Sequence, residues 1–152
     1  MAEYGYIEVQ TIQPGGSAIL QDVRPCNKCP QYVVHDNLTP NLILRGIVRN
    51  TACCNPKAQY NVSFSGNIAV TEGGAAGEIQ LGLSVNGYVR PLTIGAANPA
   101  ADSEYWYVGG QTTIDVPAGC CTTVAVVNAS SAGITPATID VRNLNVTVTR
   151  VA

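Results

Sequence analysis

The segment Gln59–Thr71 alternates large apolar side chains with polar or small ones along most of its length. Period-2 alternation is typical of a strand with one face in a core and the other toward solvent. We therefore predict a half-buried strand here, and we include Tyr60 and Phe64 of its apolar face among the candidate interface residues. The apolar face comprises Tyr60, Val62, Phe64, Ile68 and Val70, and the polar face comprises Asn61, Ser63, Ser65 and Asn67.

Two further segments carry the same alternation together with a local signal for a turn or an irregularity. The segment Glu78–Ile94 contains Asn86-Gly87 between alternating runs, which predicts a β-hairpin because a type I′ turn needs two residues with positive φ. In Thr138–Val151 the apolar positions change parity at Arg142-Asn143. A parity change within one strand predicts a β-bulge, which inserts one extra residue into the pleat.

The rest of the chain reads as short strands separated by Gly, Pro and Asn, and no window carries the apolar stripe of a helix. We expect a single domain over residues 1–152, built as an all-β antiparallel sandwich of about ten strands. Residues 1–16 would form an arm or a first strand, and residues 96–101 an exposed crossing loop. The remaining predicted strands are Tyr6–Ile12, Ser17–Val23, Gln31–His35, Asn41–Val48, Glu104–Val108, Thr112–Val116 and Thr122–Asn128.

The amino-acid composition of the chain limits the classes of function that we expect for it. Of the 152 residues only 12% are charged, against about 25% in typical soluble domains. A surface with so few charges favours self-association. The net charge is −2, and Lys28 and Lys57 are the only lysines, so no basic stripe is available to bind nucleic acid. The apolar runs are shorter than the ~20 residues of a membrane helix, and the N-terminus does not read as a signal peptide.

Six cysteines occur as three close pairs, Cys26 with Cys29, Cys53 with Cys54, and Cys120 with Cys121. Disulfides or buried thiols are the favoured interpretation, a structural metal site is second, and redox chemistry is the weakest. Because adjacent strand residues point to opposite faces, we expect one cysteine of each adjacent pair to face inward and the other outward. An outward cysteine could cross-link subunits in an oxidising setting outside the cytosol.

The sequence offers no catalytic constellation and implies no cofactor. His35 is the only histidine, and beside Asp36 it reads as the end of a strand rather than a dyad. No Gly-x-Ser-x-Gly motif and no calcium-loop spacing is present. The dense aromatic patch is Tyr105-Trp106-Tyr107, for which two interpretations stand. Either Trp106 is in the core and the tyrosines are half-exposed, or the tyrosines form a contact with a partner.

Three stretches carry a resemblance to a known family. They are Tyr60–Val70, Val116–Val124 and Asn143–Arg150. They resemble small proteins of Firmicutes genomes and their prophages, which are similar to the C1q/TNF-like jelly roll that caps collagen-like proteins of the spore surface. The resemblance covers most of the chain from about Asn41 onward, and it implies a ten-stranded jelly roll packed as a three-fold trimer. The chain lacks the Gly-x-y stalk of the collagen-linked members.

The resemblance implies a non-enzymatic structural protein packed as a trimer. The missing stalk favours direct docking of this trimer on a lattice at the surface of a phage particle. A capsid-decorating or head-fibre protein on the virion surface is the first expectation. A spore-surface or appendage subunit is an alternative within the same class. A module that binds a glycan or a receptor through loops such as 96–101 is an alternative from a different class.

Overall fold

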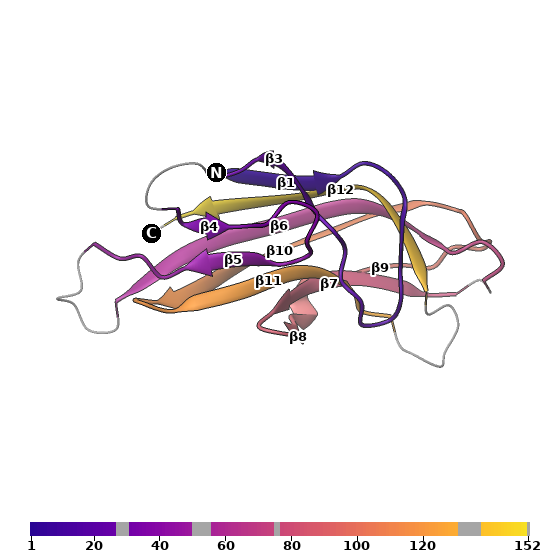
Figure 1. Cartoon of the computed structure of the whole chain (residues 1–152). Helices are drawn as coiled ribbons and strands as arrows, with labels where there is room; N and C mark the ends of the chain where they lie inside the picture. Colours follow the sequence, from indigo (N-terminus) through magenta and orange to yellow (C-terminus); the bar gives the residue numbers. More distant parts are fainter. Residues whose placement is uncertain (27–30, 50–55, 75–76, 131–137, 152) are drawn as a thin grey trace.

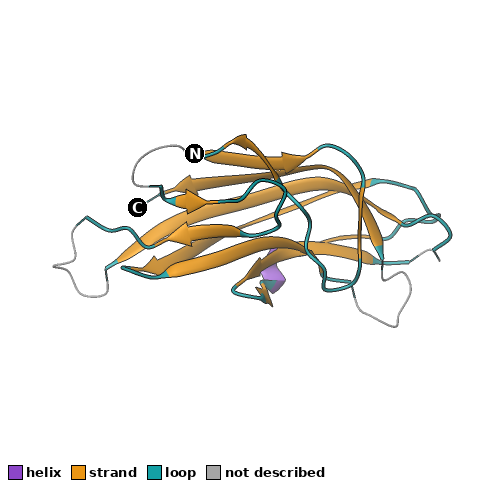
Figure 2. Ribbon diagram, in the orientation of Figure 1, coloured by secondary structure: helices purple, strands orange, loops and turns teal. Residues whose placement is uncertain are grey.

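The computed structural model describes residues 1–26, 31–49, 56–74, 77–130 and 138–151. Two antiparallel sheets pack face to face as a sandwich (Figures 1 and 2). The strands are β1 (Ala2–Tyr6), β2 (Gln10–Ile12), β3 (Gln21–Arg24), β4 (Val33–Val34), β5 (Leu42–Arg45), β6 (Lys57–Val70), β7 (Ile79–Val85), β8 (Tyr88–Val89), β9 (Gly95–Ala97), β10 (Trp106–Pro117), β11 (Cys121–Asn128) and β12 (Ile139–Arg150), with a 3-10 turn η1 (Pro91–Thr93).

The first sheet has the order β10-β6-β12-β1-β3, with β2 paired to β12. The second has the order β4-β5-β11-β7-β8, with β9 paired to β7. The strand β6 alternates between fully buried and half-buried residues along its length, as its sequence predicts. Its apolar face meets the apolar positions of the other sheet, so the core lies between the two sheets.

The predicted hairpin turn at Asn86-Gly87 and the predicted bulge at Arg142-Asn143 are both confirmed. Asn86 and Gly87 have φ of 51° and 86° and connect β7 to β8, as a type I′ turn requires. The pairing of β12 with β6 shifts register between Arg142 and Asn145. Asn143 has φ of 52° within that shift, so the predicted bulge lies where the parity changes.

Several strand boundaries differ from the prediction. Glu104–Val108 and Thr112–Val116 are not two strands, because β10 runs without a break from Trp106 to Pro117. The predicted strand Tyr6–Ile12 is divided between the end of β1 and the whole of β2.

The predicted loop 96–101 begins inside β9, whose Ala97 is buried. Residues 1–16, expected as an arm or first strand, contribute β1 and β2 to the first sheet.

Candidate functional site

Across β10, β6 and β12 the outer face of the first sheet carries a continuous field of uncharged polar side chains, which we call the polar face. The pairings align Thr113, Asn61 and Thr149 in one row across β10, β6 and β12. The next row aligns Gln111, Ser63 and Thr147 in the same strand order. The polar face comprises Asn61, Ser63, Ser65 and Asn67 of β6, Asn145, Thr147 and Thr149 of β12, and Gln111 and Thr113 of β10.

One end of the polar face is aromatic. Tyr107 pairs with Asn67, which in turn pairs with Arg142, so this row ends the polar face with an aromatic and a charged side chain. The Tyr107 side chain is 74% exposed. The Arg142 guanidinium lies 3.8 Å from the centroid of the Tyr105 ring, a cation–π contact that holds this ring in place. Burial raises the pKa of Tyr105, which is consistent with a half-buried phenol.

Trp106 is not a core residue, so the first of the two interpretations of this patch is wrong for it. The residue is 42% exposed, because it begins β10 at the edge of its sheet. Its indole N–H donates to a carboxylate oxygen of Glu104 at 3.1 Å. The other oxygen of Glu104 accepts from the backbone N–H of Ala100 at 3.0 Å. The aromatic end of the polar face is therefore tied down by short-range hydrogen bonds.

Tyr60 and Phe64 do not belong to an interface. They are 0% and 3% exposed and lie in the core between the sheets of one chain. The Tyr60 hydroxyl donates to the carbonyl of Arg45 at 2.6 Å, which links β6 to the other sheet. Burial raises the pKa of Tyr60, and the nearby Arg150 guanidinium opposes this rise. The second sheet covers the face of β6 that carries Tyr60 and Phe64, so this face is not available to another subunit.

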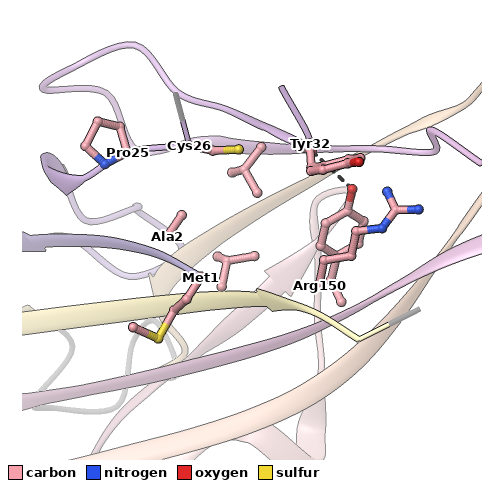
Figure 3. A pocket seen from close by; sticks show the side chains of 9 residues that line it. Met1, Ala2, Pro25, Cys26, Tyr32 and Arg150 are labelled. Atoms are coloured by element: carbon pink, nitrogen blue, oxygen red, sulfur yellow. Dashed lines mark hydrogen bonds between the residues drawn. The ribbon is translucent and has the colours of Figure 1, made fainter. Parts of the chain in front are cut away.

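A pocket of about 220 Å³ opens at the end of the sandwich where β12 finishes (Figure 3). The Arg150 guanidinium lies 4.3 Å from the Tyr32 ring centroid and donates to the carbonyl of Ile47 at 2.6 Å. The described lining contains neither a carboxylate nor an imidazole. The lining residues are Met1, Ala2, Pro25, Cys26, Tyr32, Val33, Tyr60, Val148 and Arg150.

The described cysteines correct one expectation. Cys120 and Cys121 are both exposed free thiols, although we expected one of them to face inward. The reason is that Cys120 lies in the turn before β11, and the first inward residue of that strand is Thr122. Cys29, Cys53 and Cys54 lie outside the described residues. Within the described ranges, no cluster of three or more histidine, cysteine or carboxylate side chains could hold a metal ion.

His35 pairs with a residue that the sequence did not indicate. Its Nδ1 shares a hydrogen bond of 2.5 Å with Asp22 of β3, and its Nε2 donates to the Thr39 carbonyl at 2.8 Å. The Tyr4 ring meets the imidazole edge-on at 5.0 Å between centroids. His35 therefore fastens β3 to the turn after β4. This partner could not be read from the sequence, because 13 residues separate the two side chains.

No protein-family model and no curated protein matches the chain. The TNF protein Eiger from S. frugiperda is a structural neighbour with a TM-score of 0.65 and 10% identity, covering 99% of this chain and 91% of its own. The C-terminal domain of EclA, a sugar-binding protein, is also found, with a TM-score of 0.37, 14% identity, and coverage of 75% and 81%. The likeness to Eiger gives the chain a TNF-like jelly-roll fold, as the resemblance implied. Within the described residues no helix has the length and apolar content to cross a membrane.

Proposed function

We propose that the chain is a non-enzymatic structural module that assembles as a homotrimer through the polar face of its first sheet. The observation that carries this proposal is Tyr107, a large aromatic side chain exposed at the end of a wide uncharged sheet face. Tyrosine is enriched at the centres of protein interfaces, where it supplies apolar area together with a hydrogen-bonding hydroxyl.

The chemistry of the polar face suits contact with copies of itself. Close to a three-fold axis a side chain meets its own copies, so a charge there would face like charges and lose its hydration. The hydroxyls and amides of the polar face avoid this cost, because each can donate and accept hydrogen bonds across the axis. The charged pair Lys57–Asp115 lies at the far end of β6, beyond the last uncharged row.

The setting that we propose is the surface of a phage particle, with the trimer decorating the capsid. The family resemblance supports this setting. The exposed thiols of Cys120 and Cys121 could also cross-link neighbouring subunits there, because such bonds persist in an oxidising environment outside the cytosol. The spore surface remains the alternative setting. A glycan-binding module remains the alternative function, and the exposed rings of Trp106 and Tyr107 are the observation that favours it, since they could stack on a sugar.

Analytical ultracentrifugation tests the trimer. Three copies of the 15.9 kDa chain give a species of about 48 kDa. We expect Asn61→Lys to dissociate this species, because it places three like charges around the axis. The matched control Asn41→Lys, which changes an exposed residue beside β5 of the other sheet, should leave the trimer intact. A wild-type monomer at micromolar concentration would refute the proposal, and so would a folded Asn61→Lys variant that still forms trimers.

Immunogold labelling tests the setting. Antibodies against the chain are applied to phage particles and, separately, to spores released by the same producing culture. We expect label on the phage particles. Label on spores alone would move the protein to the alternative setting, and label on neither would contradict a decorating role.

A glycan array probed with the trimer and with Tyr107→Ala tests the alternative function, which requires a signal that this substitution removes.

A further inference from the structure

The turn between β8 and η1 displays large apolar side chains almost completely to solvent. Leu92 is 99% exposed and Tyr88 is 81% exposed, and Arg90 and Pro91 lie between them. We call residues 88–92 the knob. In Figure 1 the knob projects from the edge of the second sheet, beside β7. Exposed apolar residues grouped in this way mark an interaction surface more often than single scattered ones do.

The knob is held rigidly by hydrogen bonds at its base. The backbone N–H of Arg90 donates to the Leu83 carbonyl at 2.8 Å. The Thr93 hydroxyl donates to the Arg90 carbonyl at 2.6 Å and accepts from the Leu83 N–H at 3.0 Å. Thr93 is 1% exposed, so these bonds are shielded from water. Leu92 therefore projects from a backbone turn that is already fixed, and little backbone entropy is lost when a partner covers it.

A groove lies on the outer face of the first sheet. Its volume is about 300 Å³, and it runs over β1 and β3 with Leu144 beneath it. Gly5 keeps the floor open, because a Cβ at this position would lie 2.7 Å from the Leu144 carbonyl oxygen. Val23 and Ile7 supply exposed apolar walls. We call this feature the groove, and its lining is Glu3, Gly5, Tyr6, Ile7, Gln21, Val23, Asn143, Leu144 and Asn145.

The groove adjoins the polar face. Glu3 pairs with Thr147 and Gly5 pairs with Asn145, so both continue rows of that face onto β1. One carboxylate oxygen of Glu3 accepts from the Asn145 side-chain amide at 2.8 Å, which fixes its direction. Neither Glu3 nor Arg90 forms an ion pair with another described residue. The groove thus holds a positioned anion, and the knob carries a cation.

We propose that the knob of one copy docks into the groove of the next copy, with Leu92 on the apolar walls and Arg90 beside Glu3. This proposal rests on the trimer proposed above and names its second contact. Within one chain the two features cannot meet, because the knob lies at the β8 edge of one sheet and the groove at the β3 edge of the other. The contact is therefore head-to-tail, and such a contact closes into a ring when the rotation between copies is three-fold.

Charge reversal tests the contact by sedimentation equilibrium. We expect Arg90→Glu and Glu3→Arg each to weaken trimer formation by about tenfold or more, since each places like charges together. The double variant restores the opposite pair and should return the association to within about threefold of wild type. The control Arg49→Glu changes an exposed arginine outside both features and should have no effect.

A second set of variants covers the case in which Glu3→Arg disturbs folding. Glu3→Gln keeps the acceptor for Asn145 and removes only the charge, and Leu92→Ser removes the apolar contact from an exposed position. Both should be folded by circular dichroism and should dissociate more readily. A wild-type monomer would refute the trimer itself. A wild-type trimer that all four single variants leave unchanged would refute the knob contact alone, and so would a double variant whose losses add.

Discussion

Alkaline pH should destabilise the chain through Tyr4, which is 1% exposed between the sheets. Burial raises the pKa of this phenol from 10.0 to about 12, the nearby Asp22 carboxylate adds to the rise, and the Cys26 backbone opposes it. The folded state therefore holds the phenol proton more tightly than the unfolded state does. The resulting stability is complete below pH 10 and is lost as the pH rises through about 12.

The magnitude follows from the difference between the two pKa values. At about 1.36 kcal/mol per pH unit, the rise corresponds to about 2.7 kcal/mol, a large part of the free energy of unfolding of a small domain. Urea unfolding at fixed protein concentration, at pH 8 and again at intervals up to pH 12, measures the loss. The Tyr4→Phe variant lacks this proton, so its free energy of unfolding should fall less over the same range. An equal alkaline loss in wild type and variant would refute the burial of this hydroxyl.

Three further predictions follow from the packing. Phe64→Ala should lower the free energy of unfolding by about 3–5 kcal/mol, because it leaves a cavity between the sheets, and urea unfolding measures this; a loss below 1 kcal/mol would contradict the core position. Gly46→Ala should cost at least about 1–3 kcal/mol in the same assay, since its Cβ would lie 2.0 Å from the Pro117 carbonyl oxygen. Lys57→Ala should raise the pKa of Asp115 in an NMR titration, because the ammonium donates to that carboxylate at 2.6 Å and holds its pKa low; an unchanged pKa would show that the pair does not persist in solution.

The strands that could be predicted are those whose signals are local. The alternation of β6, the Asn86-Gly87 turn and the parity change at Arg142-Asn143 each depend on a few consecutive residues. The continuity of β10 through Gly109 and Gly110 could not be predicted, because glycine is depleted in strands. The reason for these glycines lies in the tertiary structure. A Cβ at Gly110 would lie 2.3 Å from the Thr93 carbonyl oxygen, so only glycine allows the backbone of β10 to pass so close to η1.

The candidate site, too, could be predicted only where its signals are local in the sequence. Alternation indicates that Tyr60 and Phe64 share a face, but it cannot indicate whether a second sheet or a second subunit covers that face. The prominence of Tyr107 could be anticipated, because it shares parity with Tyr105 in a strand. The knob and the groove could not, since their residues come from segments about 50–90 positions apart that only the sheet order places at opposite edges. Of the polar face, only the part on β6 could be predicted, from the alternation of Asn61, Ser63, Ser65 and Asn67.

The division between an apolar core and an uncharged outer face has a consequence for how the proposed trimer would form. The core is completed by the two sheets of one chain, so each copy can fold before it meets another. Burying the polar face adds little hydrophobic free energy, because hydroxyls and amides exchange bonds with water for bonds with a partner. Affinity would then depend on a few apolar anchors, Tyr107 and Leu92 in particular, while the polar rows fix the register. On this reasoning the Asn61→Lys monomer should keep the wild-type circular dichroism spectrum. If it unfolded instead, the polar face would be part of the folding unit, and assembly and folding would be a single step.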